Sequence, residues 1–338
     1  MGVRLRDVAE HAGVSVKTVS NVVHGYVHVA PATRQRVQDA LDELNYRPNL
    51  SARSLRRGRS GVIALALPAL DMPYFAELTR FVVQAAEARG WTVLIDQTDG
   101  LREREQVVAA GVRSHLIDGL ILSPVALGVN ELTRSRDETP VVLLGERIGG
   151  GAIDHVAIDN VAAARTAIEH LLDLGRRRIA VIGYQARPAS DSGVAALRRR
   201  GYEETLAAHG IEVDDRLTIE VGGFGRQDGA GAMRELLSLK QPPDAVFCFN
   251  DLLALGALRR MSEEGVRAPD DIAVIGLDNI EDGQFSTPTL STVAPDKETI
   301  AFRAVEMLHE RLAPESTRPP RDVRVGFELI ARESTLGR

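Results

Sequence analysis

A short run near the N-terminus carries side chains that suit the reading and holding of DNA. The amine of Lys17 can donate to O6 and N7 of guanine, the amide of Asn21 can bind a base edge or a phosphate, and Val16 can pack on a thymine methyl group. Hydroxyl side chains that suit phosphate oxygens stand among them, at Ser15, Thr18 and Ser20. The run therefore predicts a face that both positions a duplex and reads its bases.

Two short helices and a turn are expected to hold these side chains. Leu5–Ala12 has apolar residues at offsets of three and four, which predicts a helix with one apolar face. Gly13 can turn the chain sharply, and Ser15 can cap a second helix from Val16 to about Val23. This arrangement is typical of a helix-turn-helix, whose second helix presents its first residues to the major groove.

A third helix, expected from Pro31 to about Leu44, would close a small core over the first two. Its apolar residues have the spacing for that packing. Thr33 lies in its first turn, where a helix N-terminus favours phosphate. An ordinary three-helix bundle with a polar face would show the same pattern, so the spacing alone leaves both interpretations open.

Charge is distributed unevenly along the chain. Residues 1–60 hold ten Lys or Arg against five Asp or Glu, a net charge of +5, whereas the remaining 278 residues carry a net charge of −11. A basic part joined to an acidic remainder is typical of a polyanion-binding module fused to a domain that does not bind nucleic acid. A basic solvated surface would give the same balance.

The composition indicates a globular protein of two or three compact units. Its 338 residues are 44% hydrophobic and 26% charged. The sequence shows neither the apolar segment of a secretory signal nor an uninterrupted run of about 18 apolar residues. We therefore expect a cytoplasmic protein that does not enter a membrane.

Beyond residue 61, apolar strand-like runs alternate with helical segments. The pattern extends over about 62–160 and restarts over about 176–290, with closing elements at Lys297–Arg311 and Val325–Ile330. Repeated strand–helix units with apolar strands predict parallel sheets that are covered on both faces. The expected fold is an all-α helix-turn-helix domain followed by an α/β body of two similar parallel-sheet subdomains.

The expected domain boundaries follow from these patterns. The helix-turn-helix domain is placed at 1–46, a hinge or linker at 47–61, and the body at 62–338. Within the body, one subdomain is expected to comprise 62–160 plus 291–312, and the other 161–290 plus 313–338.

Polar and aromatic residues follow several strands at the edge where two such subdomains would face each other. Ligands of open α/β sheets bind beyond the carboxyl ends of the strands. Tyr74 and Phe75 follow the first strand and could stack on a sugar or a purine, with packing in the core as the alternative. Asp159, Asn250 and Asp278 each come directly after a strand and can bond hydroxyl groups.

Other candidate chemistry is set aside. Asp251 is expected to cap the helix that follows it, and Cys248 lies in the apolar run Ala245–Phe249, which indicates a buried strand thiol. Gly222–Gly225 lacks the G-x-G-x-x-G spacing of a dinucleotide loop. The eight histidines are scattered, and no nucleophile is grouped with a base, so we expect no metal site, no cofactor and no catalysis.

The N-terminal region resembles the lactose-repressor/galactose-repressor (LacI/GalR) family. The resemblance lies in DVAEHAGVSVKTVSNVV at 7–23 and TRQRVQDALDELNYRPN at 33–49. The layout of the body is similar to that family's effector domain, itself like periplasmic sugar-binding proteins, so the resemblance covers essentially the whole chain. It implies that Val16 and Lys17 set the operator preference and that Asn21 is a third specificity position.

The resemblance also gives a role to the linker. Pro48 disfavours helical geometry in the residue before it, and Asn49 can cap a short segment over residues 50–55. In the family this segment becomes helical only on operator DNA, and a leucine from each of two subunits wedges into the minor groove. Leu55 matches that leucine, with Ala52 on the near face. A homodimer on a pseudo-palindromic, double-stranded operator is therefore implied.

For the body, the resemblance implies a small-molecule effector that shifts operator binding. Arg198 and Phe224 match family positions that contact the ligand, as do Asn250 and Asp278. Purine-responsive members carry an additional arginine six residues before the position of Arg198, and here that residue is Ser192. This difference, together with Asn250, favours a saccharide effector over a purine or nucleoside.

We therefore expect an allosteric transcriptional regulator, a repressor by its family resemblance. A sugar-binding module without DNA function and a sugar-modifying enzyme are the alternatives for the body alone. The basic helix-turn-helix argues against the first alternative, and the lack of a catalytic grouping in the sequence argues against the second.

Overall fold

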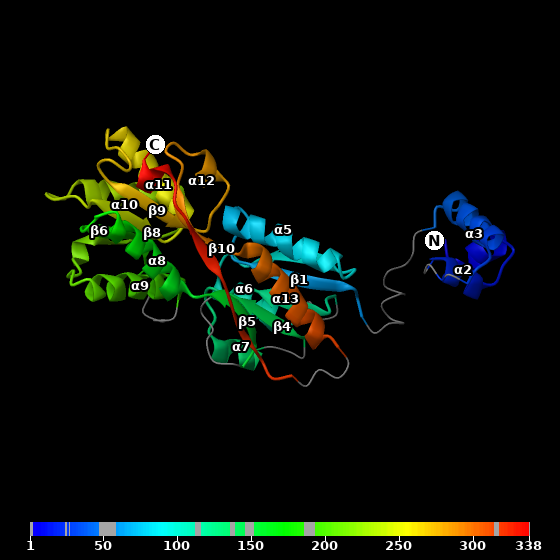
Figure 1. The fold of residues 1–338 in the computed structure, drawn as a ribbon. Coiled ribbons are helices and arrows are strands. Elements are labelled where there is room, and N and C mark those ends of the chain that lie inside the picture. The colour runs from blue at the N-terminus through cyan, green and yellow to red at the C-terminus, as the bar shows by residue number, and fades with distance from the viewer. Residues whose placement is uncertain are drawn as a thin grey trace. The chain divides into compact units, whose positions relative to one another are not determined.

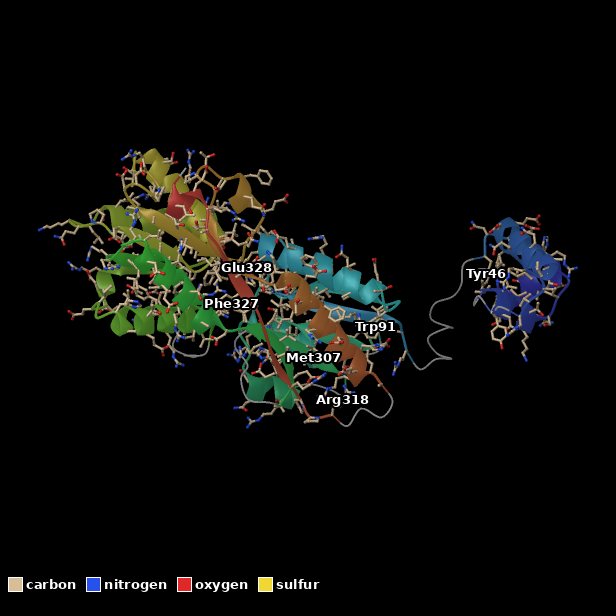
Figure 2. The ribbon with its side chains drawn as sticks, viewed as in Figure 1. Tyr46, Trp91, Met307, Arg318, Phe327 and Glu328 are labelled. Atoms are coloured by element: carbon tan, nitrogen blue, oxygen red, sulfur yellow. The ribbon has the colours of Figure 1, made fainter. Side chains whose placement is uncertain are left out.

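The structure, a computed structural model, divides into two compact units, Met1–Ser60 and Gly61–Arg338. The ribbon of both units is drawn in Figure 1 and their side chains in Figure 2, and each unit has its own hydrophobic core. The residues that the structure describes are 3–23, 26, 28–46, 59–111, 116–135, 139–145, 152–185, 193–313 and 318–337.

The first unit is a bundle of three short helices, as the sequence predicts. These helices are α1 (Leu5–His11), α2 (Val16–Val23) and α3 (Pro31–Glu43). Val8, Val19 and Val37, one from each helix, have no exposed surface. Gly13 turns the chain between α1 and α2 with a φ of +63°, a conformation that residues with a Cβ seldom adopt. The apolar faces of the three helices therefore meet around these valines.

The second unit begins with a six-stranded sheet in the order β11-β5-β4-β3-β1-β2. Its strands are β1 (Val62–Leu67), β2 (Thr92–Gln97), β3 (Gly119–Leu122), β4 (Val141–Leu144), β5 (Asp154–Ile158) and β11 (Asp322–Val325). Side by side on one face lie α5 (Pro73–Glu87) and α13 (Lys297–Arg311), while α6 (Arg102–Ala109) and α7 (Val129–Ser135) cover the other. Strand β1 shows why both faces need cover: Ile63 and Leu65 are buried in one cluster, and Ala64 in the other.

A second six-stranded sheet has the order β12-β10-β9-β8-β6-β7. Its strands are β6 (Ile179–Tyr184), β7 (Thr218–Glu220), β8 (Ala245–Cys248), β9 (Ala273–Leu277), β10 (Ser291–Pro295) and β12 (Phe327–Ile330). Helices α8 (Asn160–Asp173) and α9 (Val194–Ala208) cover one face, and α10 (Arg226–Leu237) and α11 (Asp251–Glu263) cover the other. Three shorter helices complete this sheet's segment of the chain. In sequence, η1 (Asp215–Leu217) precedes β7, α12 (Asp282–Phe285) lies between β9 and β10, and α14 (Glu333–Leu336) follows β12.

The two sheets repeat one topology, which confirms the predicted fold class. The order β2-β1-β3-β4-β5 in the first sheet corresponds to β7-β6-β8-β9-β10 in the second. The paired strands are parallel, apart from the antiparallel pair β10 and β12. Within the described ranges, no helix combines the length and the apolar character needed to cross a membrane.

The expected division of the C-terminal segment between the subdomains needs correction. Strand β10 was expected in the first subdomain, yet Thr292 pairs with Gly276 of β9, so β10 belongs to the second sheet. Strand β11 was expected in the second subdomain, yet Val323 pairs with Val156 of β5 in the first sheet. The physical reason is that the chain crosses between the sheets three times, after β5, after β10 and after β11. Only the pairing of strands that are distant in the sequence shows where these crossings occur. The expected single element Val325–Ile330 is consequently two strands, divided at Gly326.

Candidate functional site

Helix α2 and the residue before it carry six of the ten predicted DNA-binding residues. Lys17 is exposed and the Val16 side chain is 44% exposed, whereas Thr18, Ser20 and Asn21 are half-buried. Valines on the opposite side of α2 are buried against α1 and α3. The helix therefore turns an apolar side to the bundle and offers Lys17 to a partner.

Ser15 fixes the start of α2 in the way its position predicts. Its Oγ accepts a hydrogen bond from the backbone N–H of Thr18 at 3.1 Å and lies 2.8 Å from Oγ1 of the same residue. Such a bond satisfies one of the unpaired donors of a helix N-terminus. The hydroxyls of Ser15 and Thr18 are therefore already engaged with each other, and a phosphate would have to share them.

The remaining predicted DNA-binding residues lie elsewhere. Thr33 is half-buried in the first turn of α3, where its N–H donates to the carbonyl of Ala30 at 3.0 Å. Asn49, Ala52 and Leu55 lie outside the described residues.

In the second unit, hydrogen bonds to other residues hold Arg198 in place. This residue of α9 is 8% exposed, and its Nε donates to Oδ1 of Asn160 at 2.7 Å. Its Nη1 also donates to the carbonyl oxygen of Phe249, which directly follows β8. A charged hydrogen bond to a buried amide orients the planar guanidinium group. Arg198 is thereby fixed near the carboxyl end of β8.

Asp278 follows β9 and lies in the same region. It is 8% exposed and has a φ of +122°, an unusual conformation for a residue other than glycine. Burial raises the pKa of Asp278 to about 8, while the charge of Arg198 acts in the opposite direction. A carboxyl group with such a pKa keeps its proton over much of the neutral range, so it can donate as well as accept a hydrogen bond.

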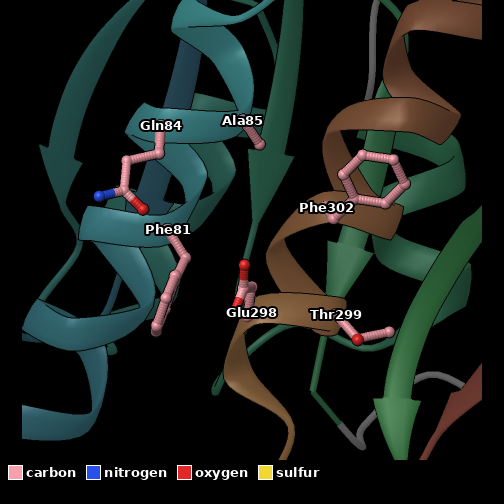
Figure 3. Close-up of a pocket in the computed structure, with 6 residues that line it drawn as sticks. All are labelled: Phe81, Gln84, Ala85, Glu298, Thr299 and Phe302. Atoms are coloured by element: carbon pink, nitrogen blue, oxygen red, sulfur yellow. The ribbon is translucent and has the colours of Figure 1, made fainter.

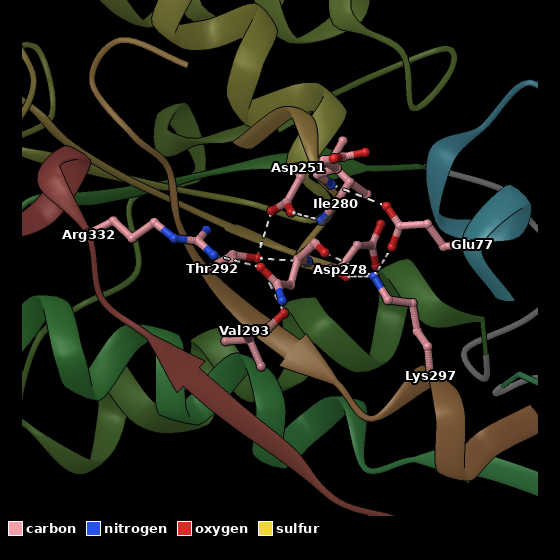
Figure 4. Close-up of polar contacts among 10 residues, drawn as sticks. Glu77, Asp251, Asp278, Ile280, Thr292, Val293, Lys297 and Arg332 are labelled. Atoms are coloured by element: carbon pink, nitrogen blue, oxygen red, sulfur yellow. Dashed lines mark hydrogen bonds and ion pairs between the residues drawn. The ribbon is translucent and has the colours of Figure 1, made fainter. Parts of the chain in front are cut away.

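Asn250, rather than Asp251, caps the helix after β8. Oδ1 of Asn250 accepts from the N–H of Leu253 at 2.8 Å, and its Nδ2 donates to the carbonyl of Phe224 at 3.0 Å. The capping role expected for Asp251 is therefore wrong. Its carboxylate points instead to β10, accepting from Oγ1 of Thr292 at 2.7 Å (Figure 4).

Asp251 belongs to a cluster of buried polar residues that contacts the loop after β9. Its other oxygen accepts from the N–H of Ile280 at 2.9 Å, and its side chain is 1% exposed. Burial raises the pKa of Asp251 to about 6, and the hydrogen bonds from Thr292 and Ile280 act to lower it. Asp251 therefore holds the loop that carries Asp278.

The predicted aromatic residues are half-buried. Tyr74 and Phe75, at the start of α5, contact each other edge to face with ring centroids 5.2 Å apart. Tyr74, Phe75 and Phe224 all pack against the main core cluster. Nζ of Lys297 lies 5.9 Å from the centroid of the Tyr74 ring, which brings Tyr74 toward the groups around Asp278.

Asp159 differs from the other candidates because it is exposed. Its Oδ1 accepts from the N–H of Ala162 at 2.9 Å, so it caps α8. The next residue, Asn160, is the one that contacts Arg198, and it is 2% exposed. Asn160, which the sequence analysis did not single out, is therefore the residue of this pair in polar contact with Arg198.

Three polar residues of this region were missing from the sequence prediction: Asn160, Glu77 and Lys297. Lys297 is the first residue of α13, where a positive charge opposes the helix dipole. That unfavourable placement is a signal from which Lys297 could have been recognised. The side chains of Glu77 and Asn160 show no comparable signal, since helix positions tolerate both.

A separate groove of about 370 Å³ lies between α5 and α13 (Figure 3). It is lined by Phe81, Gln84, Ala85, Glu298, Thr299 and Phe302. None of the predicted effector-binding residues lines it.

Metal and thiol chemistry have little support in the described part of the chain. No group of three or more His, Cys, Asp or Glu side chains there is placed to hold a metal ion. Cys248 is fully buried in β8, and burial raises the pKa of its thiol. The prediction of a buried strand thiol is confirmed.

Both units match known protein families. Residues 4–49 match the family model described as bacterial regulatory proteins, lacI family, and residues 168–335 match a periplasmic binding protein-like domain. The transcriptional repressor PurR of Mannheimia succiniciproducens is 31% identical over 336 residues, which are 98% of each chain.

Two solved structures are similar over almost the whole chain. The lac repressor dimer bound to operator and the anti-inducer ONPF has a TM-score of 0.86 at 27% identity, covering 99% of this chain and 100% of that one. The complex of the transcriptional regulator CelR with cellobiose has a TM-score of 0.72 at 30% identity, covering 98% of this chain and 99% of that one.

Proposed function

This chain belongs to the lacI family of bacterial regulatory proteins and is a DNA-binding transcription regulator, and we propose that a saccharide in its two-sheet body controls its hold on operator DNA. The proposal has a DNA-binding part in the first unit and an effector-binding part in the second. We further propose that it represses transcription, as its relatives' names state of them.

The observation that carries the effector part is the burial of two ionisable residues beside strand ends. Arg198 and Asp278 are each 8% exposed, and Asp278 lies on a loop of unusual backbone conformation. Burying an ionisable group either costs free energy in its charged form or shifts its pKa, and such groups are concentrated at binding sites. A fixed guanidinium beside a carboxyl that can donate or accept suits the vicinal hydroxyl groups of a sugar, with half-buried aromatic rings as a flat apolar wall.

The DNA part rests on the exposed side of α2. Lys17 and Val16 lie in its first turn, the part of a recognition helix that meets base edges. Residues 1–60 carry a net charge of +5, which supports binding to a polyanion. We propose that Lys17 and Val16 set operator preference, with Asn21 as a third reading position.

We propose that the protein acts as a homodimer on a pseudo-palindromic operator. Paired hinges, each contributing Leu55 to the minor groove, would align only while the two bodies keep one relative position. The lac repressor structure is of a dimer bound to its operator, which supports this arrangement. A regulator of bacterial DNA acts in the cytoplasm, and we propose no catalytic step, membrane contact or cofactor for it.

A saccharide is favoured over a purine or nucleoside, the alternative within the same family. The CelR structure contains cellobiose and shares the fold over nearly the whole chain. The position at which purine-responsive members carry an extra arginine is Ser192 here, and it lies outside the described residues.

A thermal-shift screen tests the effector class. Purified protein is heated with cellobiose, other mono- and disaccharides, guanine, hypoxanthine and cytidine at equal concentrations. A ligand at 100 times its Kd stabilises the native state by about 2.7 kcal/mol, which is a resolvable rise in Tm. A rise with saccharides alone supports the proposal, and a rise with nucleobases or nucleosides alone overturns the saccharide class.

Selection of binding sites from random duplex DNA tests the DNA part. We expect a pseudo-palindrome to emerge, and Lys17→Ala should change which bases are preferred within each half. Leu55→Ala should weaken binding to the selected site far more than binding to random duplex. A selection that returns no sequence would refute the DNA-binding part.

A further inference from the structure

Two charged side chains of the first subdomain reach the loop that carries Asp278 in the second. Glu77 lies on α5 and Lys297 is the first residue of α13, and these helices pack side by side on the first sheet. The loop, residues 278–281, connects β9 of the second sheet to α12. The contact therefore joins parts that would separate if the two sheets moved apart (Figure 4).

Lys297 has an acceptor for each of its three donor hydrogens. Its Nζ donates to Oε2 of Glu77 at 2.5 Å. It also donates to the carbonyl oxygens of Asp278 at 2.7 Å and Asn279 at 2.9 Å. An ammonium group has three donors and no acceptor, so this set of contacts is complete. Lys297 is 8% exposed, and its charge is therefore compensated almost entirely by these groups.

Glu77 uses both carboxylate oxygens in the same contact. One accepts from Lys297, and the other accepts from the backbone N–H of Glu281 at 3.1 Å. The loop is therefore bound by both residues. Lys297 donates hydrogen bonds to its carbonyl oxygens, and Glu77 accepts one from a backbone N–H.

The loop is also fixed on its other side. Asp278 and Asn279 have φ values of +122° and +49°, which are strained for residues other than glycine. Nη2 of Arg332 donates to Oδ1 of Asn279 at 2.8 Å, and Asp251 accepts from the N–H of Ile280 at 2.9 Å. These two hydrogen bonds hold the strained backbone of the loop. The carbonyl oxygens of Asp278 and Asn279 therefore stay directed toward Lys297.

We propose that Glu77 and Lys297 form a latch that holds the two subdomains together and makes their closure depend on the state of the Asp278 loop. The carboxyl of Asp278 interacts electrostatically with Arg198 of the proposed effector site, while its backbone carbonyl accepts a hydrogen bond from Lys297. A ligand that bonds to the carboxyl and shifts the loop changes the hydrogen bonds between Lys297 and the loop carbonyls. The two residues are positioning residues, and the link from closure to operator affinity rests on the proposed function.

The physical reason for a two-state latch is the cost of separating its parts. Breaking the contact would leave an almost fully buried ammonium and a carboxylate without partners until water reached them. Intermediate separations are therefore disfavoured relative to a closed pair and a fully solvated one. Ligand binding can shift such an equilibrium only by its difference in affinity for the two states.

Spin-label distances test the latch without any ligand or DNA. Labels are attached at Glu87→Cys on α5 and Ser262→Cys on α11, both exposed positions on opposite subdomains. Cys248 is fully buried, so it does not compete for the label in the folded protein. Pulsed electron resonance then gives the distribution of distances between the subdomains for each variant.

Lys297→Met should move or broaden this distribution relative to the parent, and Glu77→Gln should do so in the same direction. The double variant should add little, because each single change already opens the contact. Arg303→Met is the matched control, since Arg303 lies on the same helix in an exposed pair with Glu306 at 2.7 Å. Should Lys297→Met fail to fold, Glu77→Gln decides. Distributions for Glu77→Gln or Lys297→Met that superimpose on the parent and on Arg303→Met overturn the latch.

Operator affinity then tests the coupling separately. With the operator obtained by selection, Lys297→Met should change the Kd by about tenfold, within the usual range of allosteric coupling. A change in subdomain distance with no change in Kd would keep the latch and overturn its coupling to DNA. A parent protein that binds no operator would instead contradict the proposed function, and the distance result would stand by itself.

Discussion

Nε of Arg198 lies 2.7 Å from Oδ1 of Asn160, and both side chains are almost fully buried. The two residues come from α9 and α8, which are adjacent on one face of the second sheet. Arg198 also donates to the carbonyl of Phe249, so its guanidinium plane is held from two sides. The arginine expected to contact the effector is therefore preorganised by a residue that the sequence analysis did not single out.

Asn160→Ala should weaken effector binding without abolishing the fold. A hydrogen bond to a charged group contributes about 1.5–3 kcal/mol, so the Kd for the saccharide with the largest thermal shift should rise by about 10- to 100-fold. Isothermal titration of that saccharide measures the change. Arg199→Ala is the control on the same helix, because Arg199 pairs with Glu203 and stacks on Tyr184. Equal losses in both variants would contradict a specific role for Asn160.

The raised pKa of Asp278 predicts how stability changes with pH. Its folded pKa is about 8, against about 3.9 for an unperturbed Asp. Between these values the folded protein keeps a proton that the unfolded chain has lost, so this group's contribution to the free energy of unfolding falls as pH rises. Asp251, with a pKa raised to about 6, acts in the same direction over the lower part of that window.

Unfolding temperatures at pH 5, 6, 7, 8 and 9 measure this effect when Asp278→Asn is compared with the parent. Asparagine cannot ionise, so the parent should lose stability relative to the variant as pH rises toward 8 and change little beyond it. Taking the difference between the two proteins removes the contributions of all other titrating groups that the substitution leaves unaffected. Parallel curves for the two proteins would show that Asp278 does not hold a proton in the native state.

Much of the fold follows from local patterns, and the rest depends on pairing between distant segments. The apolar periodicity of α2 and the run Val62–Leu67 identify their elements because neighbouring residues decide them. The sheet assignments of β10 and β11 could not be found in this way. Both strands are short, and their hydrogen-bonding partners lie in another part of the sequence.

The same limit applies to the candidate site. Asn250 and Asp278 were predictable because each follows a buried strand. Which of two adjacent polar residues caps a helix was not, since Asn250 and Asp251 are both good caps and only the contact of Asp251 with Thr292 decides between them. Glu77 and Lys297 are separated by 220 positions, so their contact follows from the packing of α5 on α13.

Ser15→Ala should destabilise the first unit by about 1 kcal/mol, the usual value of an N-cap. The substitution removes the oxygen that accepts from the N–H of Thr18 at 3.1 Å. Hydrogen exchange of the α2 amides in the full chain measures the loss, with faster exchange expected over Val16–Val23. Gln38→Ala, on the exposed side of α3, serves as the control and should leave those amides unchanged. Unchanged α2 protection in Ser15→Ala would show that the cap does not stabilise this helix.

Gly256→Ala should be strongly destabilising because α10 and α11 approach each other at this residue. A Cβ on Gly256 would lie 1.9 Å from the carbonyl oxygen of Arg226, so the backbones would have to separate. Overpacking of this kind costs about 1–3 kcal/mol, and a clash with backbone gives the upper part of that range. Urea unfolding of the full chain measures the change. Gly231→Ala is the matched control: it lies in α10 with open space around a new Cβ, and there alanine should stabilise the helix by about 0.5–1 kcal/mol. If both variants were equally stable, the two helices would not be in backbone contact at Gly256.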